Sequence, residues 1–260
     1  MPRTIQRALG LIGSLGLLAI MAMPVSAQNE AFVRVVHASP DAPNVDVWVD
    51  GETVLTDVPF TAVSDYLALP AGTYNVQVTA TGSTDPVIDA DLTFEASTSY
   101  TVAATGLLAD ITATVLTDDR LPADGQAKLR VFHASPSAPT EVDVAVTDGP
   151  ILVEALAYPD ASYLTVDAGT YPLEIRAAGD ENATLMLEAT LEAGQNYTAI
   201  AMDDPDAEVP VQVIVATESM AASPDTAMTA STTPIALIGV AVLGLAIATA
   251  LPVAARRSRA

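Results

Sequence analysis

The sequence contains no cysteine and only two histidines among its 260 residues. Without cysteine the protein has neither disulfides nor thiolate metal sites, and one histidine per half of the chain cannot build a zinc site unless several carboxylates converge on it. Basic residues are also scarce: 32 acidic residues lie between Glu30 and Asp225, together with only five basic ones. Such a charge distribution favours solubility and repels nucleic acid and anionic lipid headgroups, so we expect neither as a partner.

Helical periodicity is missing from the chain before residue 234. Short runs instead alternate between apolar and polar residues, as in Val45 to Val49, and turn residues such as Asp50-Gly51 separate them. Each unit of about 95 residues holds roughly seven such runs, which is typical of a β-sandwich. The sequence therefore predicts an all-β protein whose domains are immunoglobulin-like sandwiches.

One stretch of the sequence occurs twice. Residues 33–43 read VRVVHASPDAP, residues 129–139 read LRVFHASPSAP, and a Val-Asp-Val run follows each. Later positions recur at an offset of 97 residues, and the recurring pairs are Tyr66 and Tyr163, Gly72 and Gly169, Tyr74 and Tyr171, Gly82 and Gly179, and Tyr100 and Tyr197. We therefore predict two tandem domains, at 28–118 and 128–217, with a polar linker at 119–127.

The N-terminus has the order of a secretory signal. Arg3 and Arg7 precede an apolar run from Ala8 to Met23, and small residues follow at 25–27. We assign residues 1–27 to a signal peptide, with an uncleaved membrane anchor as the alternative.

The C-terminus has the pattern of a membrane anchor. Residues 234–255 carry no charge and are long enough to cross a bilayer as one helix. Arginines follow within residues 256–260, which marks that tail as cytoplasmic and the rest of the mature chain as extracellular. Residues 218–233 are rich in Ser, Thr, Ala and Pro, as in a flexible stalk. We expect a single-pass protein of the cell membrane.

His37 and His133 occupy the same place in the two repeats. As functional groups they would be metal ligands or general bases, with Asp41 or Asp46 nearby. Ser137 replaces Asp41 in the second repeat, so the repeats do not share such a pair. The favoured interpretation is that each imidazole hydrogen-bonds backbone groups where a strand enters the Ser-Pro turn, because turns leave backbone groups in need of partners.

Arg34 and Arg130 also recur, within a very acidic region. They could clamp an anionic ligand, but an ion pair inside each repeat, with Asp46 or Asp143, is the favoured interpretation.

Trp48 is expected on the outward face of its strand, where the second repeat has Ala145. An exposed indole there can stack on a sugar ring or a protein partner, and a loop can equally cover it.

Calcium is the most reasonable ligand to consider for the acidic loops, because hard cations prefer oxygen ligands. The candidate ligands are Asp118, Asp119, Asp203, Asp204 and Asp206. No loop of the D-x-D-x-D-G type is present, and a solvated acidic surface is the alternative. We expect no other cofactor.

The segment VRVVHASPDAPNVDVWVDG, with a later LPAGTYNVQV, resembles the exported family called domain of unknown function 4397. Both repeats match, over about residues 31–217. The resemblance implies a bacterial or archaeal surface module, often in tandem and without an established activity, and it carries over no catalytic residue.

We therefore expect a non-catalytic cell-surface protein for adhesion, envelope structure or display of a binding surface, with an extracellular protein or a glycan as partner. The alternatives are a module that binds carbohydrate or calcium, and a hydrolase that uses His37 or His133.

Overall fold

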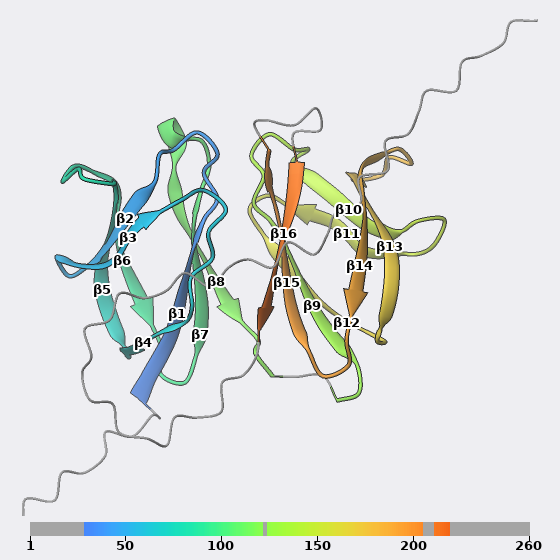
Figure 1. The fold of residues 1–260 in the computed structure, drawn as a ribbon, viewed down its shortest axis with the longest axis horizontal. Helices are drawn as coiled ribbons and strands as arrows, with labels where there is room; N and C mark the ends of the chain where they lie inside the picture. Colours follow the sequence, from blue (N-terminus) through green and yellow to red (C-terminus); the bar gives the residue numbers. More distant parts are fainter. Residues whose placement is uncertain (1–28, 122–123, 205–210, 219–260) are drawn as a thin grey trace, which may run out of the picture.

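The computed structural model describes residues 29–121, 124–204 and 211–218 (Figure 1). The predicted signal peptide, C-terminal helix and cytoplasmic tail lie outside these residues, and so does the predicted stalk except for its first residue, Glu218, which ends the last strand. Among the described residues, no helix is long and apolar enough to span a membrane. Strands dominate this part of the chain, with one short 3-10 helix, which confirms the all-β class.

Within the described residues, each half of the molecule contains eight strands. The first half comprises β1 (Glu30–His37), β2 (Val45–Val49), β3 (Glu52–Val58), β4 (Leu67–Pro70), β5 (Gly72–Ala80), β6 (Pro86–Phe94), β7 (Ser99–Thr105), the 3-10 helix η2 (Leu108–Asp110) and β8 (Thr112–Asp118). The second half comprises β9 (Ala127–His133), β10 (Glu141–Val146), β11 (Ile151–Ala157), β12 (Ala161–Val166), β13 (Gly169–Ala177), β14 (Ala183–Leu191), β15 (Asn196–Asp203) and β16 (Val211–Glu218).

The two halves have the same topology, as their repeated sequence predicts. In the first domain one sheet has the order β4-β1-β7-β8 and the other β3-β2-β5-β6. The second domain repeats this with β12-β9-β15-β16 and β11-β10-β13-β14. In both domains two sheets pack face to face as a sandwich.

The strand order differs from that of an immunoglobulin constant domain. β1 lies between β4 and β7 and runs parallel to β7, and β9 runs parallel to β15 in the same way. An immunoglobulin constant domain instead splits seven strands into the ABED and CFG sheets. Alternating sequence patterns indicate which residues are buried, but they do not determine which strands become neighbours.

A tyrosine opens the long strand β7 and another opens β15. The hydroxyl of Tyr100 accepts the backbone N–H of Glu95 at 3.1 Å, and that of Tyr197 accepts the N–H of Glu192 at 3.0 Å. This bond back to a turn a few residues upstream is the feature known as a tyrosine corner. It fixes the entry of each strand.

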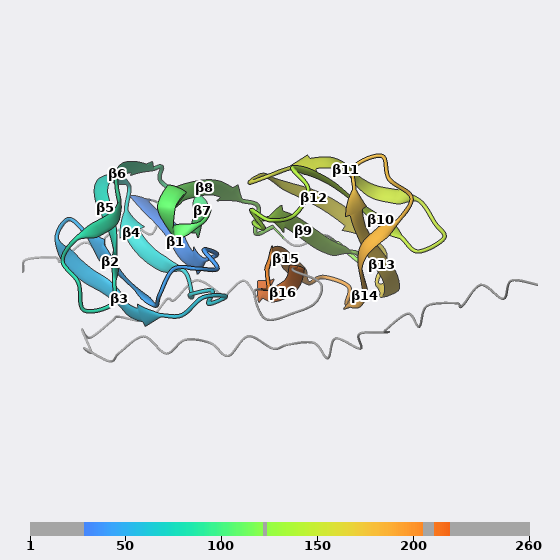
Figure 2. The same ribbon diagram turned by 90° about the horizontal axis from the view of Figure 1, so that it is seen from above.

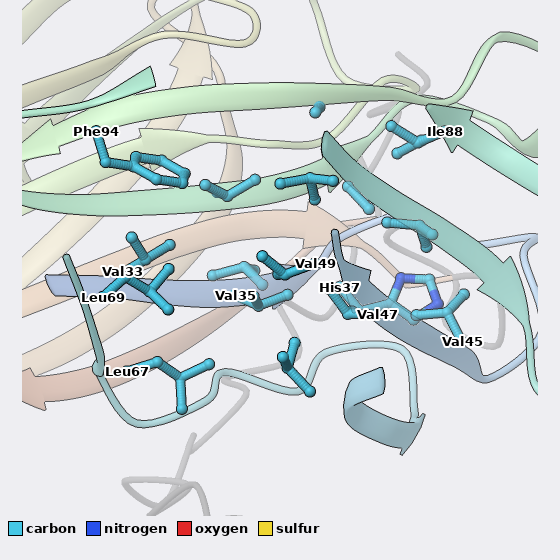
Figure 3. Close-up of a pocket in the computed structure, with 17 residues that line it drawn as sticks. Val33, Val35, His37, Val45, Val47, Val49, Leu67, Leu69, Ile88 and Phe94 are labelled. Atoms are coloured by element: carbon cyan, nitrogen blue, oxygen red, sulfur yellow. The ribbon is translucent and has the colours of Figure 1, made fainter. Parts of the chain in front are cut away.

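The core of the first domain leaves a small apolar cavity of about 40 Å³ between its two sheets (Figure 3). Valines 33, 35, 45, 47 and 49 line it, with Phe94 and Ile88 at opposite ends. In the second domain a space beside His133 measures about 10 Å³.

A further buried cluster joins the two domains. Val36, Ala38 and Ala103 of the first domain pack with Phe132 and Ile200 of the second. The sheet that contains β1 thus faces the sheet that contains β9 across the domain boundary (Figures 1 and 2). The four sheets form four layers, and the two inner sheets are covered on both faces.

Candidate functional site

Strand β1 directs alternate side chains to opposite faces of its sheet. Val33 and Val35 pack inside the first domain, whereas Arg34 and Val36 face the second. The guanidinium of Arg34 donates to the hydroxyl of Thr198, across the boundary, at 3.1 Å. The repeat places Arg130 at the equivalent point of β9. Arg34 of the first domain therefore points toward the second domain, and Arg130 of the second domain points toward the first.

Asp118, the last residue of β8, is the acceptor at the centre of this boundary. Arg130 of the second domain donates to one of its carboxylate oxygens, and the Nε of Arg34 lies 3.6 Å from the other. Thr101 donates to the same carboxylate at 2.7 Å, and so does the hydroxyl of Tyr66 at 2.6 Å. We call Arg34, Thr101, Asp118, Arg130 and Thr198 the interdomain joint.

The interdomain joint is buried: Arg130 is 0% exposed, Arg34 3% and Asp118 7%. Taking charges out of water costs several kcal/mol per ion, which only close partners offset. Surrounding contacts support the joint, since Arg120 lies over the Tyr66 ring at 4.2 Å and Asn196 donates to the Arg120 carbonyl at 2.9 Å. The predicted clamp residues are therefore inside the molecule, where they join its two halves.

The predicted partners of the two arginines, Asp46 and Asp143, are wrong. Arg34 pairs with Asp118 of its own domain, and Arg130 pairs with the same carboxylate across the boundary. Asp143 instead lies 3.8 Å from the Nε of Arg176. Asp46 accepts the backbone N–H of Asp57 at 2.8 Å and that of Gly82 at 3.2 Å. Asp143 accepts the equivalent N–H groups, of Ala155 at 2.9 Å and Gly179 at 3.1 Å.

The carboxylates of Asp46 and Asp143 stabilise residues whose backbone conformation is unfavourable. Asp57 and Ala155 have φ angles of 54° and 47°, which are strained for residues other than glycine. Burial alone would raise the pKa of Asp46, but its hydrogen bonds outweigh burial and hold the pKa below the usual value. The hydrogen bond from Ala155 lowers the pKa of Asp143 in the same way. The Val-Asp-Val run is thus a structural element.

The histidines also bind backbone, as the favoured interpretation predicted. His37 Nε2 lies 3.0 Å from the Pro43 carbonyl, and His133 Nε2 lies 2.9 Å from the Pro139 carbonyl. Since a carbonyl only accepts, each ring carries its proton on Nε2. Burial lowers the pKa of both rings, despite the opposing effect of these hydrogen bonds.

Each imidazole is 0–1% exposed and ties the end of a strand to the far end of the turn that follows. Phe60 contacts the His37 ring edge-on, and Tyr158 contacts that of His133. The neighbouring Ser135 donates to Asp203, the last residue of β15, so this carboxylate holds the turn after β9 against the neighbouring strand.

The candidate calcium ligands serve separate contacts. Asp118 binds the arginines of the interdomain joint, Asp119 pairs with Lys128 at 2.7 Å, and Asp203 binds Ser135. Asp204 has interactions of its own, and Asp206 lies outside the described residues. In the part of the chain that the structure describes, no three His, Asp or Glu side chains come together as a metal site.

Trp48 lies on the outer face of its sheet, half-buried, as the strand alternation predicted. Its indole Nε1 donates to Thr79 Oγ1 on the neighbouring strand at 3.1 Å. Gln77 is the residue directly opposite on β5, and Asp89 follows on β6. An aromatic ring with amides and carboxylates beside it can bind a polar ligand.

Two features of these sites escape sequence analysis. Thr101 and Thr198 complete the interdomain joint, and Asn75 and Gln77 complete the surroundings of Trp48. The sequence does contain one sign that the inner sheets are covered by the other domain. β1 and β9 are apolar at consecutive positions, as at Val35 and Val36, which is typical of a strand covered on both faces.

Known proteins resemble this chain only distantly. A search of curated proteins finds no match. Among solved structures, a carbohydrate-binding module of family CBM26 from Eubacterium rectale Amy13K, in complex with maltoheptaose, is 8% identical, with a TM-score of 0.26; the alignment covers 71% of this chain and 95% of that one. The Bacillus anthracis TIE protein is 11% identical, with a TM-score of 0.23 and coverage of 67% and 33%. Both TM-scores are far below 0.5, and the fold description above rests on the strand pairings alone.

The family comparison is more informative. A family model described as a domain of unknown function, DUF4397, matches residues 31–145 and again residues 140–229. The two matches together cover both sandwiches and contain both copies of the His-Ala-Ser-Pro motif. This chain is therefore a tandem member of the DUF4397 family.

Proposed function

We propose that this protein is a non-catalytic module of the cell surface, which presents two sandwiches as one rigid body to an extracellular partner. Its signal peptide, at 1–27, directs export, and the helix at 234–255 holds it in the membrane. The observation that carries the proposal is the interdomain joint, because a buried Arg–Asp–Arg arrangement between two domains fixes their relative orientation.

The chemistry of the motif supports a role without catalysis. A general base must reach the proton that it abstracts, within hydrogen-bond distance or through one water. His37 and His133 are enclosed, and each donates its Nε2 proton to a proline carbonyl of its own turn. The two histidines, which first suggest an active site, instead stabilise the turns that follow β1 and β9.

Protease treatment of intact cells tests the location. We expect the full-length chain to be recovered with membranes and to be cleaved by protease added outside the cells. A variant that ends at residue 233 should appear in the medium. Recovery of the full-length chain in the cytoplasm, intact after protease treatment, would contradict the proposal.

A further inference from the structure

The outer face of the β3-β2-β5-β6 sheet carries a single indole among amides and carboxylates. Trp48 on β2, Gln77 on β5 and Asp89 on β6 form one row across three strands. Asn75 and Asp91 form the adjacent row on β5 and β6. Asp89 and Asp91 are exposed, and Trp48, Asn75 and Gln77 are partly exposed.

Hydrogen bonds hold these polar groups in place before any ligand arrives. Gln77 Nε2 donates to Asp89 Oδ2 at 3.0 Å, and Asn75 Nδ2 donates to Asp89 Oδ1 at 2.8 Å and to Asp91 Oδ1 at 3.2 Å. The amide N–H groups are therefore directed at the carboxylates. A carboxylate has about four lone-pair sites, so Asp89 and Asp91 retain acceptor capacity for hydroxyl donors.

The indole is fixed as well. Trp48 stands opposite Gln77, but its Nε1 donates to Thr79, the next residue of β5 on that face, at 3.1 Å. The ring therefore leans along the sheet toward Thr79, and the side chain stays partly exposed. A flat aromatic surface beside fixed hydrogen-bond acceptors is complementary to a sugar ring, which has apolar C–H groups on its faces and hydroxyls at its edge.

The second domain lacks this arrangement although its backbone is the same. Ala145 takes the place of Trp48 and is 0% exposed, and Met186 takes the place of Asp89. Glu174, at the position of Gln77, accepts a hydrogen bond from Arg176 at 3.1 Å. The outer face of the second sandwich thus provides a matched control within the same molecule.

We propose that the outer face of the first domain binds a neutral glycan, with one hexose ring stacked on Trp48 and hydroxyls of the adjoining part of the glycan donating to Asp89 and Asp91. The carboxylates repel anionic saccharides and accept from the hydroxyls of uncharged ones. This inference specifies the partner of the surface module proposed above and rests on that proposal. We call Trp48, Asn75, Gln77, Asp89 and Asp91 the glycan face.

Fluorescence offers a direct test, because Trp48 is the only tryptophan in the chain. The full-length protein is titrated with neutral oligosaccharides of glucose, mannose, xylose and N-acetylglucosamine in separate experiments, and with polygalacturonate as the anionic comparison. We expect a saturable change in the emission of Trp48 with at least one neutral saccharide and none with polygalacturonate.

Variants then assign the binding to the glycan face. Calorimetric titration with the saccharide that gave the signal should show an affinity loss of about tenfold or more in Trp48→Ala, in line with the contribution of a stacked ring. Asp91→Ala should weaken binding, and Met186→Ala, on the second domain, should leave it unchanged. Unchanged melting temperatures show that the variants are folded.

Three results would overturn the inference: no neutral saccharide alters Trp48 emission, polygalacturonate binds as well as the neutral saccharides, or Met186→Ala weakens binding as much as Trp48→Ala. Any of these leaves the surface location untouched, since protease treatment of intact cells measures that independently.

Discussion

At the scale of single residues, the repeated motif is a set of side chains that satisfy backbone groups. His37 and His133 bind proline carbonyls, and Asp46 and Asp143 bind the N–H groups of turns. Each of these side chains is buried, so its removal would leave a backbone group without its partner. The motif recurs because each sandwich needs the same turn.

Substitution of His37 by alanine tests this role. The Pro43 carbonyl would lose its donor in a buried setting, and we expect the free energy of unfolding to fall by about 1–3 kcal/mol. Urea unfolding measures the change. His37→Gln retains a donor and should lose less; an alanine variant as stable as the native protein would show that the imidazole does not hold the turn.

The histidines also predict how stability depends on pH. Burial keeps the pKa of both rings below the value in the unfolded chain, about 6.5. Below that pH the unfolded state binds more protons than the native state, so stability is fully present above about pH 6.5 and falls as the pH decreases.

Unfolding by urea at about pH 7.5 and about pH 5.5 measures this dependence. The midpoint should be lower at the acidic pH, and the difference should shrink in a double variant, His37→Gln with His133→Gln. An equal pH dependence in native protein and double variant would assign it to other groups. Asp46 and Asp143 do not interfere, because carboxylates with lowered pKa values lose their charge only below about pH 4.

At the scale of strands, the two domains share one topology but differ in packing. Around the cavity of the first domain stand Val76, Val78 and Ala113, where the second domain has the larger Leu173, Ile175 and Val213. Each of these side chains in the first domain is smaller by one or two carbon atoms than its counterpart. Its lining is apolar apart from His37, so water gains few partners there.

Cavity filling provides a prediction at this scale. Val78→Ile places the side chain of the second domain in the first, and we expect it to raise the free energy of unfolding by about 1 kcal/mol. The reverse change, Ile175→Val, should lower it by about 1 kcal/mol. Chemical denaturation of both variants compares them. A loss of stability in Val78→Ile would mean that the cavity cannot accept the additional methylene group without overpacking.

Strand patterns show what sequence could and could not predict. Alternation around Trp48 correctly placed it on an outer face. Proline within a strand is typical of an edge, because it has no N–H to donate. Pro172 nevertheless lies in β13, which is paired on both sides. Its neighbour β10 reaches only as far as Leu173, beyond which the Pro172 carbonyl accepts from Thr147 at 2.8 Å, so the missing N–H costs no ladder bond. Whether a proline costs a ladder hydrogen bond depends on the register between neighbouring strands, and the register cannot be read from the local sequence.

At the scale of the whole molecule, the inner sheets of the two sandwiches form a shared core with charges at its centre. Arg34 and Arg130 were visible in the sequence as a recurring pair, but their partner Asp118 was not, because it lies 84 and 12 residues away along the chain and has no counterpart motif. Only the packing of one domain on the other brings the three together. The two sandwiches are consequently halves of one body.

Removing the central carboxylate should destabilise both halves. Asp118→Asn leaves two buried guanidinium groups with too little negative charge, and we expect a loss of about 3–5 kcal/mol. Asp119→Asn is the matched control, because its pair with Lys128 is half exposed and is worth about 1 kcal/mol or less. Thermal unfolding of the two variants compares them; equal effects would show that the joint contributes no more than a surface pair.

The central claim, that the interdomain joint holds two sandwiches together as one cooperative body, is tested most directly by scanning calorimetry of the full-length protein. The structure predicts a single transition, with a calorimetric enthalpy equal to the van't Hoff enthalpy, for both sandwiches together. In Asp118→Asn this transition should move to lower temperature or split in two. Two separate transitions in the native protein would contradict the claim.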